Sequence, residues 1–219
     1  IEAKREQAEH FRAQLKPGQH HQNADYAAMI KSLDENVGRV LDHLQARGLA
    51  DRTLVIFASD NGGYTNPWRE KVPTDNWPLR SGKGSLYEGG IRVPLIVRLP
   101  GVTPPGAICS TPVICADFLP TILDLCNEFG SAKTPIPTGL DGVSFAPLLK
   151  QPQARLPRTE LFFHYPHYYF NTTPVSAVRS GDWKLLEYFE DNRVELYNLR
   201  DDPGEAHDLA AKNLDEVNK

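Results

Sequence analysis

The stretch Thr53-Leu-Val-Ile-Phe-Ala-Ser-Asp-Asn-Gly-Gly63 decides the fold class of this 219-residue chain. Its first part, Thr53 to Ala58, is a continuous apolar and β-branched run, typical of a parallel strand that helices cover on both faces. A second such run, Val93 to Leu99, lies between two turn signals. Before both runs, apolar residues recur every three or four positions from Ala24 to about Arg47, which predicts a long packed helix. This order of elements indicates an α/β sheet with flanking helices.

The pattern changes towards the C-terminus. Residues 130–158 are rich in Pro and Gly and predict a long irregular connection, which follows a short helix from Asp117 to Leu125. Beyond it, turn residues separate four short strand candidates, which are Leu161–Tyr165, Val175–Arg179, Trp183–Phe189 and Arg193–Tyr197. They predict a small antiparallel sheet. We therefore divide the chain into an α/β part, residues 1–158, and an antiparallel β subdomain, residues 159–219.

Charge and hydropathy narrow the class of protein. Lys and Arg number 24 and Asp and Glu 28, which gives a net charge of −4 and disfavours nucleic acid as the main partner. Hydrophobic residues make up 40% of the chain and its mean hydropathy is −0.44, values typical of a globular protein. The apolar runs are shorter than a bilayer requires, so the sequence predicts no membrane span.

Asp60 and Asn61 follow the first predicted strand at its carboxyl end, where open α/β sheets place their ligand sites. Their side chains offer hard oxygen ligands suited to Ca²⁺ or Mg²⁺, and Gly62 and Gly63 let the backbone turn sharply beneath an ion. Asp-Asn-Gly-Gly is also ordinary turn chemistry. The tetrapeptide alone therefore leaves a metal site and a simple turn both open.

Lys83 stands between Gly82 and Gly84 in the segment from Arg80 to Pro94. Glycine on both sides lets an anion approach the backbone, and a lysine ammonium suits the oxygens of sulfate or phosphate. The segment does not match the Gly-x-x-x-x-Gly-Lys-Ser/Thr loop of nucleotide-binding proteins. On its own, Gly-Lys-Gly is more often a solvated turn than an anion site.

Taken together, Phe57-Ala-Ser-Asp-Asn-Gly-Gly63 and Pro78-Leu-Arg-Ser-Gly-Lys-Gly-Ser-Leu-Tyr-Glu-Gly-Gly-Ile-Arg-Val-Pro94 resemble the second half of a type I sulfatase. This arylsulfatase-like family belongs to the alkaline phosphatase-like superfamily. Further matches extend the resemblance over nearly the whole chain, and they are Tyr26–Gly38, Asp117–Asp124, Leu140–Ser144, Arg179–Lys184 and Leu196–Leu199. The resemblance implies that residues 1–158 are the latter part of the catalytic domain, with an incomplete central sheet, and that residues 159–219 are its C-terminal subdomain.

The resemblance also implies roles for particular residues. Asp60 and Asn61 correspond to two ligands of an active-site Ca²⁺, with Mg²⁺ as the less favoured ion. Lys83 corresponds to the lysine that contacts the sulfate group and stabilises charge as the ester bond breaks, and we expect Arg80 to contact substrate beside it. A cation and an ammonium would together stabilise the departing charge.

The family's nucleophile resembles a hydrated formylglycine, made from the first residue of Cys/Ser-x-Pro/Ala-x-Arg. Cys109, Cys115 and Cys126 all lack the arginine of that motif. The resemblance therefore places the formylglycine and the remaining metal ligands upstream of this chain. We expect the 219 residues alone not to turn over substrate, and we expect the missing strands to leave an apolar sheet edge through which the chain could associate.

The segment His164-Tyr-Pro-His167-Tyr-Tyr169 is the remaining candidate cluster. We expect His164 to act as a proton donor to a leaving oxygen or as a substrate contact, and His167 as a substrate contact. Tyr165, Tyr168 and Tyr169 could stack on the face of a sugar. The alternative is a strand end at which the aromatic rings pack and the histidines form local hydrogen bonds.

The function implied by the resemblance is hydrolysis of a sulfate ester, with a sulfated carbohydrate as the expected substrate and a periplasmic or secreted location. Two alternatives stay open. One is a phosphodiesterase or phosphonate hydrolase of the same superfamily, which would share the fold and the metal-bearing strand end. The other is a non-enzymatic glycan-binding or structural fragment in which the glycine-rich loops only turn.

Overall fold

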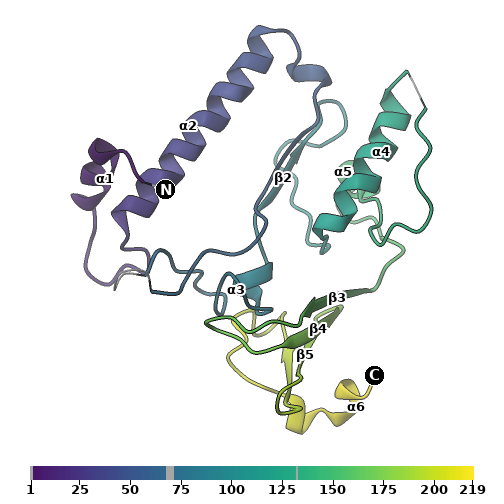
Figure 1. The fold of residues 1–219 in the computed structure, drawn as a ribbon. Coiled ribbons are helices and arrows are strands. Elements are labelled where there is room, and N and C mark those ends of the chain that lie inside the picture. Colours follow the sequence, from purple (N-terminus) through teal and green to yellow (C-terminus); the bar gives the residue numbers. More distant parts are fainter. Residues whose placement is uncertain (1, 68–71, 132) are drawn as a thin grey trace. The chain divides into compact units, whose positions relative to one another are not determined.

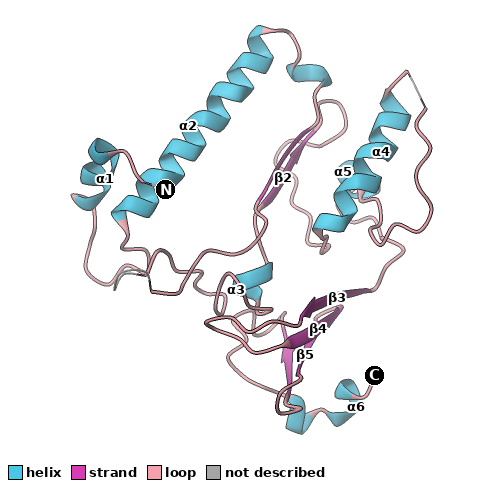
Figure 2. Ribbon diagram, viewed as in Figure 1, coloured by secondary structure: helices cyan, strands magenta, loops and turns pink. Residues whose placement is uncertain are grey.

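The computed structural model describes residues 2–67, 72–131 and 133–219, which fold into two compact units. The first unit combines the residues up to Arg47 with Asn61–Pro94 and Glu160–Lys219, and the second combines Gly48–Asp60 with Leu95–Thr159. Figure 1 traces the chain through both units, and Figure 2 distinguishes their helices and strands. The division into residues 1–158 and 159–219 stays a prediction.

Two helices open the first unit, α1 (Arg5–Arg12) and α2 (Ala24–Ala46). Helix α2 confirms the predicted helix to within one residue. The Asn23 side chain caps it by accepting a hydrogen bond from the Tyr26 amide at 3.0 Å, which satisfies one of the free amides of the first turn.

The packing predicted for α2 is wrong for the described residues. Ile30, Leu33 and Val40 of its apolar stripe expose 47%, 49% and 61% of their surface. Helix α1 contacts α2, and this contact includes a hydrogen bond that Gln7 donates to the Glu35 carboxylate at 3.1 Å. The three- and four-residue repeat therefore predicts the helix and its apolar face correctly. It does not predict which part of the protein, if any, packs on that face.

The second unit contains a strand pair and two helices. Its elements are η1 (Ala50–Arg52), β1 (Val55–Ala58), β2 (Leu95–Arg98), η2 (Cys115–Asp117), α4 (Phe118–Phe129) and α5 (Ala146–Lys150). Strand β1 pairs with β2 in the antiparallel sense, with Val55 opposite Arg98, so the predicted parallel strand is wrong for this pair. An unbroken apolar run does not report strand direction. The predicted coverage of both faces is also wrong for β2, since Ile96 is 63% exposed. Helix α5 also interrupts the predicted irregular connection.

The buried carboxylate of Asp117 organises the second unit. Its two oxygens accept hydrogen bonds from the Ile114 and Val143 amides, both at 2.9 Å, and from the two terminal nitrogens of Arg158, both at 2.7 Å. Such a bidentate ion pair with two additional amide donors satisfies a charge that is fully buried. Asp117 thereby fixes the start of α4 against two distant loops.

The C-terminal part forms the predicted antiparallel sheet, in the order β3-β4-β5-β6. Its strands are β3 (Glu160–Tyr165), β4 (Val175–Ser180), β5 (Trp183–Tyr188) and β6 (Val194–Asn198), each close to its predicted range. The remaining short helices of the first unit are α3 (Glu88–Ile91), η3 (Ala210–Lys212) and α6 (Leu214–Val217). Leu86 and Tyr87 pack with Val175, Leu186 and Tyr197 in one core, so the sheet's inner face is covered by the segment that carries Lys83.

This core also buries ionisable groups. The Lys184 ammonium lies 3.0 Å from the Glu88 carboxylate and 2.8 Å from that of Glu205, and all three side chains are at most 1% exposed. Burial raises the pKa of Glu205, although Lys184 opposes that rise. The Glu205 carboxylate also accepts the Glu88 amide at 2.6 Å, which fixes the first residue of α3.

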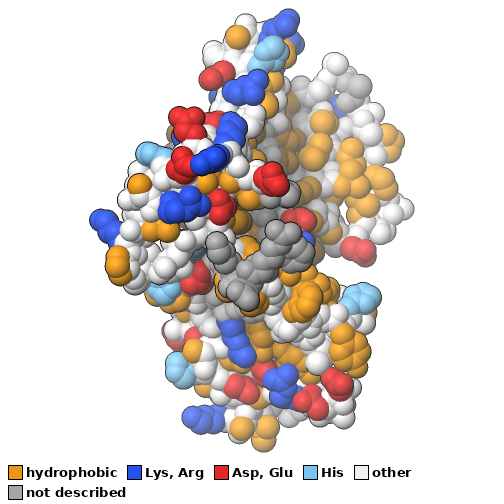
Figure 3. All heavy atoms as spheres, turned by 60° about the vertical axis from the view of Figure 1, so that its left-hand side comes forward, with side chains coloured by type: hydrophobic (Ala, Val, Ile, Leu, Met, Phe, Trp, Pro, Cys, Tyr) orange, Lys and Arg blue, Asp and Glu red, His pale blue; other side chains and the backbone are white. Residues whose placement is uncertain are grey.

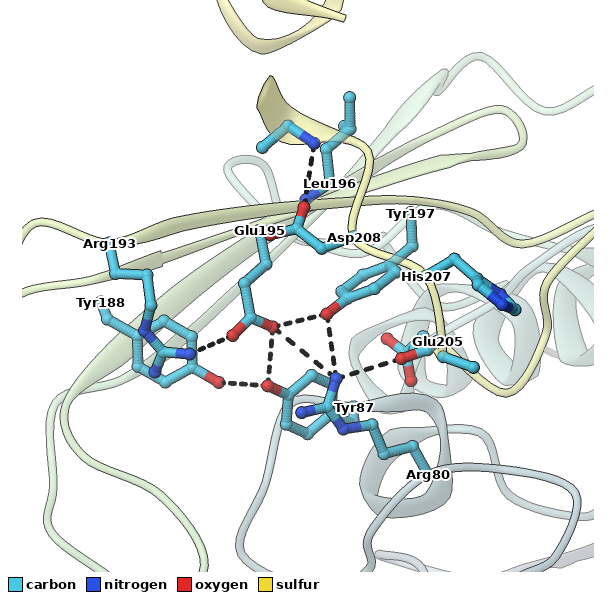
Figure 4. A network of polar contacts seen from close by, with 12 residues as sticks. Arg80, Tyr87, Tyr188, Arg193, Glu195, Leu196, Tyr197, Glu205, His207 and Asp208 are labelled. Atoms are coloured by element: carbon cyan, nitrogen blue, oxygen red, sulfur yellow. Dashed lines mark hydrogen bonds and ion pairs between the residues drawn. The ribbon is translucent and has the colours of Figure 1, made fainter. Parts of the chain in front are cut away.

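A second polar network joins the sheet to the Lys83 segment, as Figure 4 shows. Tyr87 Oη donates to Glu195 at 2.7 Å and accepts from Tyr188 Oη at 2.9 Å, and Tyr197 Oη donates to the same Glu195 oxygen at 2.8 Å. Burial and these hydrogen bonds raise the pKa of Tyr87 and Tyr197 well above the usual value for tyrosine, which is about 10.

The raised tyrosine pKa values predict a pH dependence of folding. Above about pH 10 the unfolded chain ionises its tyrosines, whereas folded Tyr87 and Tyr197 stay protonated, so the stability they contribute is present below pH 10 and is lost as the pH rises further. Urea unfolding between pH 8 and 11 should show this decline. The Tyr197→Phe variant should show a shallower decline, and Tyr168→Phe, at a 69% exposed position, should match the wild type. Equal slopes for all three proteins would contradict the interpretation.

Among the described residues, charged side chains of both signs are interspersed on the face drawn in Figure 3. This distribution agrees with the small net charge. Across the described ranges, no helix has both the length and the apolar character that a membrane span requires.

Candidate active-site loops

Main-chain hydrogen bonds join the Asn61-Gly62-Gly63 turn to the Lys83 loop within the first unit. The Gly62 amide donates to the Gly90 carbonyl at 2.9 Å, and the Lys83 amide donates to the Gly63 carbonyl at 3.0 Å. A Cβ on Gly62 would collide with the Gly89 carbonyl oxygen, so only glycine permits this approach. The structure therefore brings two of the sequence-predicted site segments together.

The Lys83 side chain is exposed, and within the described residues it forms no ion pair. Its neighbour Gly84 has φ +87°, and a Cβ there would collide with the Tyr169 ring. The backbone of the loop is thus tightly held while the ammonium stays available. A fixed backbone that presents a free cation is suited to binding the oxygens of an anion.

Asp60 and Asn61 are consecutive residues that the contact pattern assigns to different units. Asp60 is exposed and Asn61 is half-buried. A carboxylate and a carboxamide are each a ligand type that Ca²⁺ accepts. In the part of the chain that the structure describes, no three His, Cys, Asp or Glu side chains gather into a metal site.

Arg80 lies within the core network of the first unit, beside the Lys83 loop. Its Nη1 donates to Tyr197 Oη at 2.9 Å and to the Glu205 carbonyl at 3.0 Å, and its guanidinium lies 3.9 Å from the centre of the Tyr87 ring. These contacts occupy one face and one nitrogen of the guanidinium. They give Arg80 a clear structural role, and a substrate contact by this residue stays a prediction.

His164 lies on the outer face of the C-terminal sheet. Strand β3 directs Phe163 to the inner face, opposite Ala177, so the next residue, His164, lies on the outer face. There its Nδ1 lies 2.7 Å from Ser176 Oγ and its ring lies 5.8 Å from that of Phe189. Neither of these contacts involves the Lys83 loop.

His167 belongs to the loop between β3 and β4, where it is exposed and packs edge-on against Tyr165 at 5.4 Å. The same loop reaches the Lys83 segment through other residues. Asn171 Nδ2 donates to Ser81 Oγ at 3.0 Å and to the Lys83 carbonyl at 3.3 Å. Sequence reasoning missed this role, because Asn171 lies 90 residues from Ser81 along the chain.

An open hollow of about 420 Å³ lies between this loop and the tyrosine network. Its lining residues are Arg80, Tyr87, Tyr169, Phe170, Asn171, Thr172, Thr173, Tyr188 and Arg193. Aromatic rings next to hydrogen-bonding groups are typical of sites that bind sugars. The hollow borders the Lys83 loop because Asn171 contacts that loop directly.

Comparison with known proteins assigns the family. A family profile described as Sulfatase matches residues 2–128, and one described as N-sulphoglucosamine sulphohydrolase, C-terminal, matches residues 81–219. The chain therefore belongs to the sulfatase family, and the predicted resemblance is confirmed. A protein from Formosa agariphila named Sulfatase is 42% identical over 88% of this chain and 36% of its own length.

Solved structures give the same assignment and confirm the predicted α/β, alkaline phosphatase-like fold. Ps i-CgsB bound to k-i-k-neocarrahexaose matches with a TM-score of 0.76 and 29% identity, over 98% of this chain and 44% of that one. A protein solved with its substrate D-glucosamine-2-N,6-O-disulfate matches with a TM-score of 0.71 and 26% identity, over 90% of this chain and 38% of that one. The chain thus spans about two fifths of the length of these relatives.

A phosphonate monoester hydrolase from Silicibacter pomeroyi also matches, with a TM-score of 0.63 and 23% identity over 90% of this chain. At this identity the likeness concerns the fold alone. It agrees with the expectation that hydrolases of phosphorus and of sulfur esters share this architecture.

Proposed function

We propose that the full-length protein to which this chain belongs hydrolyses sulfate esters of a carbohydrate. The observation that carries the proposal is the hydrogen-bonded contact between the Asn61-Gly62-Gly63 turn and the Lys83 loop. This contact supports the proposal because it joins the backbone of a candidate metal ligand to that of Lys83, whose side chain forms no ion pair with the described residues. The family assignment supports a sulfuryl group as the anion that they bind.

Lys83 has the central role in the proposed mechanism. In a sulfate ester, negative charge grows on the bridging oxygen as the bond to sulfur breaks, and an ammonium fixed near the sulfuryl oxygens stabilises that charge. The structure supports this role because Lys83 keeps its backbone fixed by the Gly63 carbonyl while its side chain stays exposed. Binding in this way also orients the sulfur for attack.

The family resemblance implies a metal ion and a nucleophile. Asp60 and Asn61 of this chain are suitable ligands for such a metal ion. Asp60 and Asn61 would hold a divalent cation because they provide hard oxygen ligands, and the family resemblance favours Ca²⁺ over Mg²⁺. When bound, the cation would neutralise charge on the sulfuryl oxygens. Formylglycine would supply the attacking oxygen, and none of Cys109, Cys115 and Cys126 lies in the motif from which it is made.

We propose that the substrate is a sulfated sugar and that the loop between β3 and β4 contacts its ring. The exposed aromatic side chains of Tyr168 and Phe170 support this class, together with the two relatives solved with sugars. His164 and His167 remain proposed substrate contacts, and His164 also a proposed acid. A periplasmic or secreted location is proposed from the family alone.

The rival function is hydrolysis of phosphate or phosphonate esters. The full-length protein should be assayed with an aryl sulfate and the matching aryl phosphate, and kcat/KM should favour the sulfate by at least about 100-fold, or about 2.7 kcal/mol of transition-state discrimination. A preference for the phosphate would instead assign the rival function.

Removal of the Asp60 carboxylate tests the proposed metal site. Asp60→Ala should weaken Ca²⁺ binding to the full-length protein by at least about 10-fold, because it deletes a charged ligand. Calorimetric titration of Ca²⁺ measures this directly. Asp51→Ala is the matched control, since Asp51 is also an exposed aspartate of the second unit. Unchanged affinity in Asp60→Ala would favour the interpretation of this segment as a simple turn.

A further inference from the structure

The carboxamide of Asn76 makes contacts that the proposed roles of Asn61 and Lys83 do not include. Its Oδ1 accepts the Gly63 amide at 3.1 Å, and its Nδ2 donates to the Gly63 carbonyl at 3.1 Å and to the Ser81 carbonyl at 2.9 Å. The Gly63 carbonyl also accepts the Lys83 amide. A single half-buried side chain therefore ties the turn after the candidate metal ligands to the loop that carries the candidate sulfate contact.

The two loops are shaped around this side chain. A Cβ on Gly63 would lie 2.7 Å from Asn76 Oδ1, and a Cβ on Gly82 would lie 2.7 Å from Asn76 Nδ2. Only glycine at both positions lets the backbones approach the carboxamide this closely. The two glycines thus leave room for Asn76, and also for the Thr74 methyl group beside Gly63 and the Gly63 carbonyl beside Gly82.

The Lys83 loop also holds a backbone conformation that needs support. Ser81 has φ +64°, a left-handed conformation that costs a non-glycine residue on the order of 1 kcal/mol. Asn76 binds the carbonyl of Ser81, and Asn171 binds its hydroxyl at 3.0 Å. The two asparagines hold this strained residue from two sides, immediately before Gly82 and Lys83.

We propose that Asn76 is a positioning residue that keeps Lys83 in register with the Asn61-Gly62-Gly63 turn, so that both act on one sulfuryl group. Its catalytic consequence rests on the proposed function, whereas the clamp between the two loops does not. Without the clamp, the loops could shift independently by a fraction of an ångström. A misplacement of about 1 Å can cost on the order of 100-fold in rate.

The test uses the full-length protein with Asn76→Ala and Asn76→Asp. The Asp variant has the same size and retains an acceptor, but it loses both donated hydrogen bonds, so it separates hydrogen bonding from packing. Asn127→Ala is the matched control. Asn127 forms the same kind of two-way clamp in the second unit, since its Nδ2 donates to the Thr134 carbonyl at 2.8 Å and its Oδ1 accepts the Thr134 amide at 2.6 Å.

Two readouts are needed. Amide hydrogen exchange should quicken at least about 10-fold in peptides that contain Gly63 and Lys83 in both Asn76 variants, and it should not change there in Asn127→Ala. With a sulfate ester substrate, kcat/KM should fall by about 100-fold, mainly through kcat, because a misplaced lysine loses transition-state contacts first. If Asn76 has only a structural role, the Asn76 variants should melt at a lower temperature while kcat of the folded enzyme stays unchanged.

The outcomes distinguish the clamp from the proposed function. Unchanged exchange at Gly63 and Lys83 would overturn the inference, and so would faster exchange with kcat unaltered. If the wild type cleaves no sulfate ester but the exchange difference is found, the proposed function fails and the clamp is supported. If the Asn76 variants do not fold, amide hydrogen exchange of the wild-type protein provides the test. The clamp then requires the Gly63 and Lys83 amides to exchange at least about 10-fold more slowly than exposed loop amides, and equal rates would overturn it.

Discussion

Replacement of Lys83 by alanine in the full-length protein should lower kcat/KM for a sulfate ester by about 10²–10³-fold, the loss seen when one preorganised charge-stabilising donor is removed. The fold should tolerate the change, because the Lys83 side chain is exposed and its loop is held by backbone contacts and by Asn76. Steady-state kinetics with an aryl sulfate measure the loss, and thermal unfolding checks that the protein stays folded.

The matched control for Lys83 is Lys16→Ala, which removes an exposed lysine from another loop of the first unit. Its kcat/KM should stay within about 2-fold of the wild type, since a general change of surface charge has little effect on a bound transition state. A loss of less than about 3-fold in Lys83→Ala would remove Lys83 from the mechanism.

Replacement of Lys184 by methionine should cost about 3–5 kcal/mol of folding free energy, because it leaves Glu88 and Glu205 as buried charges without their shared ammonium. The deficit should shrink as the pH falls, since burial raises the pKa of Glu205 and the variant lacks the Lys184 ammonium that opposes that rise. Urea unfolding at pH 5 and pH 8 measures both effects.

A triple variant provides the control for Lys184. Lys184→Met combined with Glu88→Gln and Glu205→Gln removes all three charges together, and it should recover most of the lost stability. The carboxamide that Glu205→Gln introduces retains an oxygen that can accept the backbone amide of residue 88, as the carboxylate of Glu205 does. If the single and triple variants are equally unstable, the loss comes from packing and not from unpaired charge.

Local patterns predict much of this fold. The three- and four-residue apolar repeat predicts α2 to within a residue, and the turn residues between short apolar runs predict the four strands of the C-terminal sheet. Helices and strands can be predicted in this way because each has its own short repeat of side-chain direction along the chain. The predicted parallel direction of β1 is wrong, because strand pairing depends on β2, which lies far from β1 along the chain.

Some residues of the candidate site could likewise be predicted from the sequence, and others could not. Asn61 and Lys83 were found from short glycine-flanked segments, and the structure places their loops in contact. Asn76 and Asn171 could not be found in this way, because their roles depend on hydrogen bonds to Gly63 and to Ser81, the latter 90 residues from Asn171. Arg80 was predicted from its place beside Lys83, but its contacts are to the core network.

The most direct test of sulfate-ester hydrolysis is the release of inorganic sulfate from a sulfated glucosamine and from a sulfated galactan by the full-length protein. Ion chromatography should detect sulfate in proportion to enzyme and time with at least one of these substrates, and the rate should fall about 100-fold or more in Lys83→Ala. Release of phosphate from a matching phosphate ester, with no sulfate released from either sugar, would contradict the account.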